Sequence, residues 1–337
     1  MKLHLKYILI MTLNLVFLSN FILSNYIMKI YSNSSVFVFI LVSLFSLILL
    51  LFLPNSFKHI IKSFLSCKLI KIIMSIYIII STLLISYVLF NILSIRFFFV
   101  TPTFLLIIIF SYFLILGLIP KLSTIINTTF IISIILLVLA LIPFINFNSR
   151  DFRLLLRLDF FNINNFSFIF LLCFIFDNFL FLFIPEKQNN KINKYDIIIS
   201  TVIGVIISLW FIIDNYTFLD YSFFKDMNFP SLYRYKLYYG PKYIEHFDNF
   251  LNIFLCCYLY LKCLINGKLL RVTLNIKNNF IFSLMYSIIL CVINIFIYYT
   301  YLFKIDYIYI PCIILFISIS CIYIFLFRRS NYESNIT

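Results

Sequence analysis

A carboxylate falls within one of the apolar stretches of this sequence. Asp177, followed by Asn178, lies seven residues before the end of the apolar run 166–184. A charged side chain in lipid is costly and usually faces the interior of a helix bundle or a water-filled cavity. These residue types predict a site that binds the amine of a ligand or a proton. In the alternative, the helix is shifted or kinked, and Asp177 lies near an interface or pairs with a lysine.

Other candidate ligand-binding side chains lie in two further apolar runs. Asn14, Ser19 and Asn20 are polar positions of the run 7–28, and the last two are adjacent near its middle. They could let a helix open there and contact a ligand carboxylate, although a hydrogen bond between helices is a common role for such residues in lipid. Tyr77 precedes Ser81 by four residues, so the two share a helix face and form a weaker pair of candidates.

Three side chains of the types that bind metals lie together at Glu245, His246 and Asp248. Carboxylates at the start of a helix are already favoured by the helix dipole. The sequence offers no second cluster to complete a metal site. We therefore prefer capping and interfacial anchoring to a metal site, and we expect no metal and no cofactor.

Ten apolar runs must position these residues. Apolar residues make up 64% of the 337 residues, charged residues 11%, and the mean hydropathy is +1.10, which excludes a water-soluble domain. About 20 apolar residues cross a bilayer as a helix, and the runs are continuous, unlike the alternating segments of a membrane barrel. We predict an all-α polytopic membrane protein with one integral membrane domain over 1–337. Its expected spans are 7–28, 36–53, 72–95, 103–119, 128–145, 166–184, 197–213, 247–265, 279–301 and 305–327.

The distribution of positive charge predicts the orientation. If the N-terminus is cytoplasmic, sixteen of the 26 Lys and Arg residues fall on the inner side, as the positive-inside rule requires. Both termini are then cytoplasmic. The net charge of +14 favours contact with anionic membrane lipid and not with nucleic acid. The segment Asn266-Gly267-Lys268 is expected to form the turn between the eighth and ninth spans.

Short motifs in three of the spans resemble those of a known family. Thr101-Pro102 leads into the fourth span, Gly117 lies near its end, Phe183-Ile184-Pro185 ends the sixth span, and Glu245-His246-Phe247-Asp248 opens the eighth. This order resembles the B-subunit permeases of bacterial spore germinant receptors, the GerAB type, over nearly the whole chain. His246 stands where the family usually has Arg.

The resemblance implies a fold and a function. Such proteins are similar to amino acid–polyamine–organocation permeases, which have two five-helix inverted repeats in the LeuT-like arrangement, with broken helices 1 and 6 and a ligand site at the midplane. A B subunit is expected to bind a small nutrient such as an amino acid in the spore inner membrane. It is then expected to trigger germination through a receptor complex with A-type and C-type subunits.

A second function fits the same expectations. A secondary active transporter of amino acids or polyamines would use the same site with alternating access. An enzyme within the membrane would need acidic or histidine residues gathered at one face, whereas the twelve acidic residues are scattered over the chain. We therefore expect a non-enzymatic protein.

Overall fold

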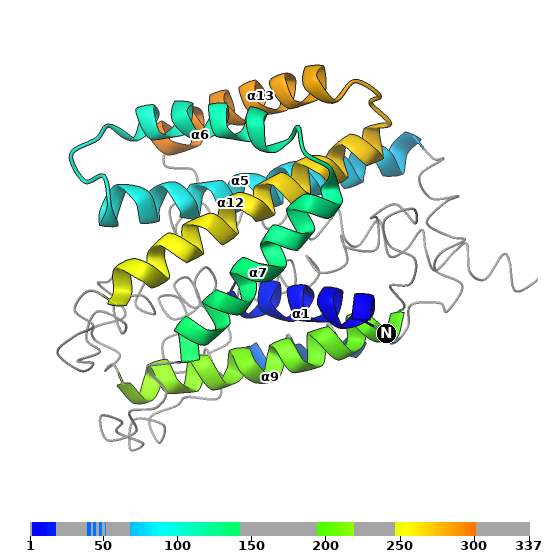
Figure 1. The fold of residues 1–337 in the computed structure, drawn as a ribbon, viewed down its shortest axis with the longest axis vertical. Coiled ribbons are helices and arrows are strands. Elements are labelled where there is room, and N and C mark those ends of the chain that lie inside the picture. The colour runs from blue at the N-terminus through cyan, green and yellow to red at the C-terminus, as the bar shows by residue number, and fades with distance from the viewer. Residues whose placement is uncertain are drawn as a thin grey trace, which may run out of the picture. The chain divides into compact units, whose positions relative to one another are not determined.

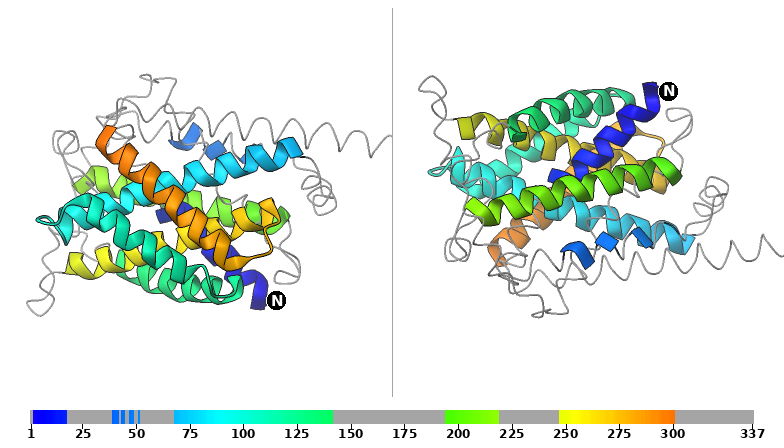
Figure 2. Two further views of the ribbon diagram at one scale, coloured as in Figure 1. Left: turned by 90° about the horizontal axis from the view of Figure 1, so that it is seen from above. Right: turned by 90° about the horizontal axis from the view of Figure 1, so that it is seen from below.

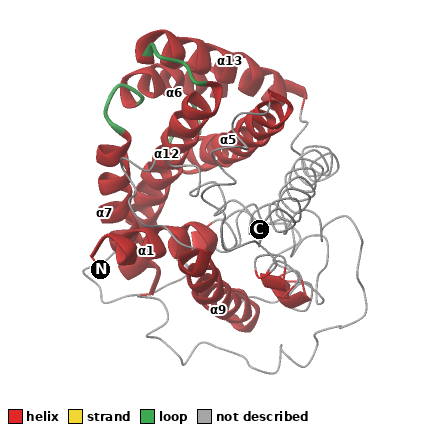
Figure 3. Cartoon of the chain, turned by 90° about the vertical axis from the view of Figure 1, so that its right-hand side faces the viewer, coloured by secondary structure: helices red, strands yellow, loops and turns green. Residues whose placement is uncertain are grey.

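The protein is all-helical wherever its structure is described. The computed structural model describes residues 2–17, 39–41, 43, 44, 47, 48, 51, 68–141, 194–218 and 247–300, and the regular elements in these ranges are helices (Figure 3). They are α1 (Lys2–Phe17), α5 (Lys68–Arg96), α6 (Thr103–Gly117), α7 (Leu122–Leu141), α9 (Lys194–Phe218), α12 (Phe247–Leu274) and α13 (Asn279–Thr300) (Figure 1). The predicted spans 166–184 and 305–327, and most of 36–53, lie outside the described residues.

Five of the described helices are long and apolar enough to cross a membrane. They are Lys71–Arg96, Leu122–Leu141, Tyr195–Asn215, Asp248–Leu274 and Asn279–Thr300. Each overlaps a predicted span, so the chain is a multi-pass membrane protein. The shorter helix α6 begins at Thr103, as predicted, directly after Pro102, whose fixed φ and missing N–H suit it to the start of a helix.

The distribution of side chains on α13 suits a lipid environment. Polar groups such as Ser283, Ser287 and Asn294 are buried. Large apolar side chains such as Phe280, Met285 and Val292 are more than half exposed. A water-soluble helix shows the opposite pattern, because its apolar face is turned inward. In lipid the apolar face needs no cover, and polar groups turn toward other helices to find hydrogen-bond partners.

The helices belong to two compact units. The first contains α1, all of α9 except its first residue, residues 133–141 of α7 and residues 247–255 of α12. The second contains α5, α6, α13, residues 122–132 of α7 and residues 256–274 of α12. Each unit therefore joins helices from both halves of the sequence.

Within the first unit, α1 and α9 run side by side (Figure 2). The Thr12 hydroxyl donates a hydrogen bond to the carbonyl oxygen of Ser200 across 3.3 Å. Gly204 makes this approach possible, since a Cβ atom there would lie 3.1 Å from Leu15 Cδ2 and 3.3 Å from the Thr12 carbonyl oxygen. Small residues are typical of such close helix contacts in membranes.

Within the second unit, α13 makes its most extensive contacts with α6, and both helices contact α5 (Figure 1). Edge-to-face aromatic pairs connect α5, α6 and α12: the Phe90 and Phe110 rings are 5.1 Å apart, and the Phe110 and Tyr260 rings 5.9 Å apart. The Tyr260 hydroxyl also donates to the Phe113 carbonyl oxygen across 2.7 Å. A Cβ atom at Gly117 would collide with that hydroxyl and with Leu264, so a larger residue there would displace both side chains.

The predicted turn at Asn266-Gly267-Lys268 is wrong, because these residues are helical and α12 continues to Leu274. Gly267 serves close packing and not a turn: a Cβ atom there would lie 2.9 Å from Tyr286 Cε1 and 3.0 Å from Leu118 Cδ2. The helix ends instead at Asn275, which adopts a φ of 56°. The Ile276 N–H bonds to the Arg271 carbonyl and the Asn275 N–H to the Val272 carbonyl, the pattern of a Schellman cap.

The start of the fifth predicted span shifts for a related reason. Polar residues between Lys121 and Asn127 placed the start of the fifth span at residue 128, yet α7 begins at Leu122. Ser123, Thr124 and Asn127 all lie within α7, although the prediction placed them before the helix. Polar residues at a helix end therefore do not mark its boundary.

Candidate functional site

The described residues include two of the six predicted ligand-binding positions. Asn14 on α1 and Tyr77 on α5 are both buried, and they belong to different compact units. The other four, Asp177, Asn178, Ser19 and Asn20, lie outside the described residues. The ligand-binding roles of all six stay predictions.

A buried polar network lies within the second unit. It consists of Ser81 and Thr82 on α5, Asn266 on α12 and Tyr286 on α13, all less than 6% exposed. The Asn266 side-chain nitrogen donates to the Ser81 hydroxyl across 3.5 Å and to the Thr82 hydroxyl across 3.3 Å. The Tyr286 hydroxyl donates to the Thr82 hydroxyl, also across 3.3 Å. One network thus connects three membrane helices.

Thr82 is the centre of this polar network, and its hydroxyl is saturated. The hydroxyl donates its proton to the Ile78 carbonyl oxygen at 2.7 Å and accepts from Asn266 and Tyr286. A threonine hydroxyl has one proton and two lone pairs, so all of its capacity is used. The side-chain oxygen of Asn266, in contrast, is buried without a hydrogen-bond partner and remains an open acceptor.

A second polar contact lies further along α5. The Ser86 hydroxyl donates to the side-chain oxygen of Asn294 on α13 across 2.8 Å. The side-chain nitrogen of Asn294 is buried without a partner. Buried polar groups are normally satisfied, and an open donor or acceptor needs an explanation such as a water or a ligand. Asn294 therefore offers an open donor where Asn266 offers an open acceptor.

A buried cation lies one turn from the polar network. Lys262 on α12 is 2% exposed, and it precedes Asn266 by four residues, so the two side chains share a helix face. Tyr258 lies one further turn away on the same face and is 1% exposed. Ionisable residues within membrane helices are rare and usually mark a substrate or ion path.

These groups suit binding of a small polar molecule. Amide, hydroxyl and ammonium groups can hold a neutral or zwitterionic ligand through directed hydrogen bonds and charge, and the surrounding apolar helices strengthen such contacts by excluding water. The described residues supply an open acceptor on Asn266, an open donor on Asn294 and a buried basic side chain, Lys262.

Most of these residues were missed by the sequence reasoning. Asn266 was predicted to lie in a turn, Lys262 is one of the sixteen Lys and Arg residues that were predicted to lie on the inner side, and the sequence analysis proposed no role for Asn294 or Tyr286. Their signal is the four-residue spacing of Tyr258, Lys262 and Asn266, which runs through the apolar segment. A comparison of the chain with protein-family models found no match, and a comparison with curated proteins found none either.

Proposed function

We propose that this chain is the nutrient-binding membrane subunit of a spore germinant receptor. It binds a small nutrient such as an amino acid within its helices and signals to A-type and C-type subunits in the spore inner membrane. The observation that carries the proposal is the polar network of Ser81, Thr82, Asn266 and Tyr286 inside apolar helices, with open hydrogen-bonding groups and a buried lysine beside it. Both termini are cytoplasmic in this proposal.

The packing of the second unit supports a permease-like fold of ten helices in two inverted repeats. In such a fold each helix of the first repeat is related by a two-fold axis to the helix five places later in the chain. Two helices related in this way contact each other when they lie near the axis. The polar network joins α5 to α12, which are the third and eighth predicted spans. The contact of α13 with α6 joins the ninth to the fourth. Breaks in helices 1 and 6 belong to this proposal and fall on segments outside the described residues.

The chemistry of the buried polar groups supports an amino-acid-like ligand. The buried ammonium group of Lys262 suits a ligand carboxylate, and the side-chain oxygen of Asn266 suits an N–H donor. The ligand-binding residues predicted from the sequence, Asp177, Asn178, Ser19, Asn20, Asn14 and Tyr77, remain part of the proposal, with Asp177 as the partner of a ligand amine.

Equilibrium binding tests the proposal directly. Purified full-length protein in lipid nanodiscs is titrated with a panel of radiolabelled amino acids. Asn266→Leu should weaken binding of the recognised amino acid by about 10-fold, because a truncated hydrogen bond at a buried site costs about 1–2 kcal/mol. Asn249→Leu is the matched control, since Asn249 lies on the same helix and is exposed.

Two outcomes would contradict the proposal. The first is that no amino acid binds at millimolar concentration, and the second is that Asn266→Leu protein, shown to be monodisperse, binds as well as the unaltered protein. Uptake of the bound amino acid into proteoliposomes containing this chain alone would instead favour the secondary transporter. Loss of germination on one nutrient after deletion of the gene, without loss of uptake, favours the receptor.

A further inference from the structure

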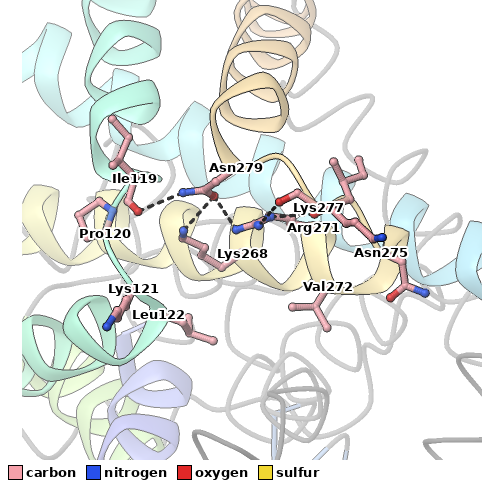
Figure 4. A pocket seen from close by; sticks show the side chains of 11 residues that line it. Ile119, Pro120, Lys121, Leu122, Lys268, Arg271, Val272, Asn275, Lys277 and Asn279 are labelled. Carbon is pink, nitrogen blue, oxygen red and sulfur yellow. Dashed lines mark hydrogen bonds between the residues drawn. The ribbon is translucent and has the colours of Figure 1, made fainter.

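A basic pocket lies at one end of the second unit. It has a volume of about 780 Å³ and is lined by residues of the α6–α7 connection and of the α12–α13 connection (Figure 4). Four of the lining residues are cationic: Lys121, Lys268, Arg271 and Lys277. The described residues that line it include no carboxylate.

Asn279, the first residue of α13, holds two of these cations in place. Its side-chain oxygen accepts from Arg271 Nη1 at 2.7 Å and from Lys268 Nζ at 3.2 Å (Figure 4). Its side-chain nitrogen donates to the carbonyl oxygens of Leu118 and Ile119, both at 3.0 Å. One neutral amide thereby ties the end of α6 to two cations of α12.

Arg271 is fixed from its other side as well. Its Nε donates to the Ile276 carbonyl oxygen at 2.9 Å and its Nη2 to the Lys277 carbonyl oxygen at 2.7 Å. The hydrogen-bond acceptors of the guanidinium among the described residues are therefore all neutral. Such a group is pre-organised for an anion, because little side-chain entropy is left to lose on binding.

Within the described part of the chain, no carboxylate compensates the charges in the pocket. Lys268 is 6% exposed, although its Nζ has only the neutral Asn279 oxygen as a hydrogen-bond acceptor among the residues the structure describes. A buried ammonium group with a neutral partner is costly, and an anion beside it would lower that cost. The N-termini of α7 and α13 also meet this pocket, and their dipoles favour negative charge.

We propose that this pocket binds the phosphate group of an anionic lipid, with phosphatidylglycerol as the simplest example. Two features favour a lipid over a free phosphate. The pocket lies where membrane-crossing helices end on the predicted cytoplasmic side. Its lining also contains apolar side chains, among them Leu122, Val272 and Ile276, which suit the glycerol and upper acyl carbons. This inference does not rest on the proposed function.

Binding of a fluorescent short-chain phosphatidylglycerol to the detergent-solubilised full-length protein tests the proposal. The side chains of Lys121 and Lys277 are exposed and make no hydrogen bond or ion pair with any other described residue, so Lys121→Gln and Lys277→Gln should leave the fold intact. Each should raise the Kd for the lipid about fivefold, and the double variant about 25-fold. Lys68→Gln removes an exposed cation at the start of α5 outside the pocket and should change the Kd less than about twofold.

Competition experiments identify the source of the phosphate. Phosphatidylcholine of the same chain length and inorganic phosphate at 10-fold excess should both fail to displace the labelled lipid at about 0.15 M salt. Displacement by inorganic phosphate would overturn the lipid assignment and would indicate that the pocket binds soluble phosphates. Equal affinities of the double variant and the Lys68→Gln protein, or no binding of phosphatidylglycerol, would overturn the proposal altogether.

Discussion

Gly267→Ala tests the packing that the structure gives to the middle of the second unit. The added Cβ atom would lie 2.9 Å from Tyr286 Cε1 and 3.0 Å from Leu118 Cδ2. The Tyr286 ring cannot yield easily, because it is 4% exposed and its hydroxyl donates to Thr82. If the ring moves, the hydrogen bond in the polar network lengthens or breaks.

The expected magnitude follows from three contributions. Alanine in place of a helical glycine contributes about 1 kcal/mol in favour of folding. Overpacking opposes it by about 1–3 kcal/mol, and loss of the Tyr286–Thr82 hydrogen bond by about 1 kcal/mol. We therefore expect Gly267→Ala to lower the free energy of unfolding by about 1–3 kcal/mol, although helix propensity alone predicts a gain.

The assay is reversible unfolding by SDS in mixed micelles, followed by circular dichroism, in a double-mutant cycle with Tyr286→Leu. The smaller side chain removes the ring that the new Cβ atom meets. Gly267→Ala should then cost at least ~1 kcal/mol less in the Tyr286→Leu background than in the unaltered protein. The reasoning is refuted if Gly267→Ala stabilises the unaltered protein or if the two substitutions are additive.

Two further predictions concern the polar network and the end of α12. Thr82→Val should lower the free energy of unfolding by about 2–4 kcal/mol, since it removes the acceptor of hydrogen bonds from Asn266 and Tyr286. Thr82→Ser keeps the hydroxyl and should lower the free energy of unfolding by less than half as much in the same SDS titration. Equal losses for the two variants would argue against the hydrogen bonds. Asn275→Ala should cost about 1 kcal/mol because φ is 56°, and Asn275→Gly should cost nothing or stabilise. A tolerated alanine at that position would mean that α12 does not end in a left-handed residue.

The positions of the membrane helices were predictable because they depend on hydropathy alone. The predicted span 279–301 and the helix α13 (Asn279–Thr300) differ by one residue, and the predicted start at residue 103 coincides with that of α6. Length and apolar composition are sufficient for this, since lipid forces a continuous helix across the bilayer.

The end of α12 and the inner faces of the helices were not predictable in the same way. A glycine at position 267 is compatible both with a turn and with close packing of two helices. The short distance from Gly267 to Tyr286 in the structure identifies close packing as its role. Apolar periodicity also fails to identify the inner face, because the lipid-facing side chains of α13 are as apolar as the packed ones. Polar residues such as Thr82 and Asn294 mark that face instead, and the sequence does not show which of them meet. The roles of Asp177 and its neighbours stay predictions.

The length of α12 determines the depth of its charged residues. Its 28 residues extend about 42 Å at 1.5 Å per residue, against about 30 Å of hydrocarbon, so the helix must tilt or project into the headgroups. If Arg271 lies at the level of the lipid phosphates, Lys262 lies nine residues or about 13 Å deeper, near the midplane for a modest tilt. The same helix then carries one cation at the depth where lipids are anionic and another at the depth where no lipid group can neutralise it. The length of α12 thus places Arg271 among the polar headgroups and Lys262 in the hydrocarbon. A thinner or thicker bilayer would change the depth of both side chains together.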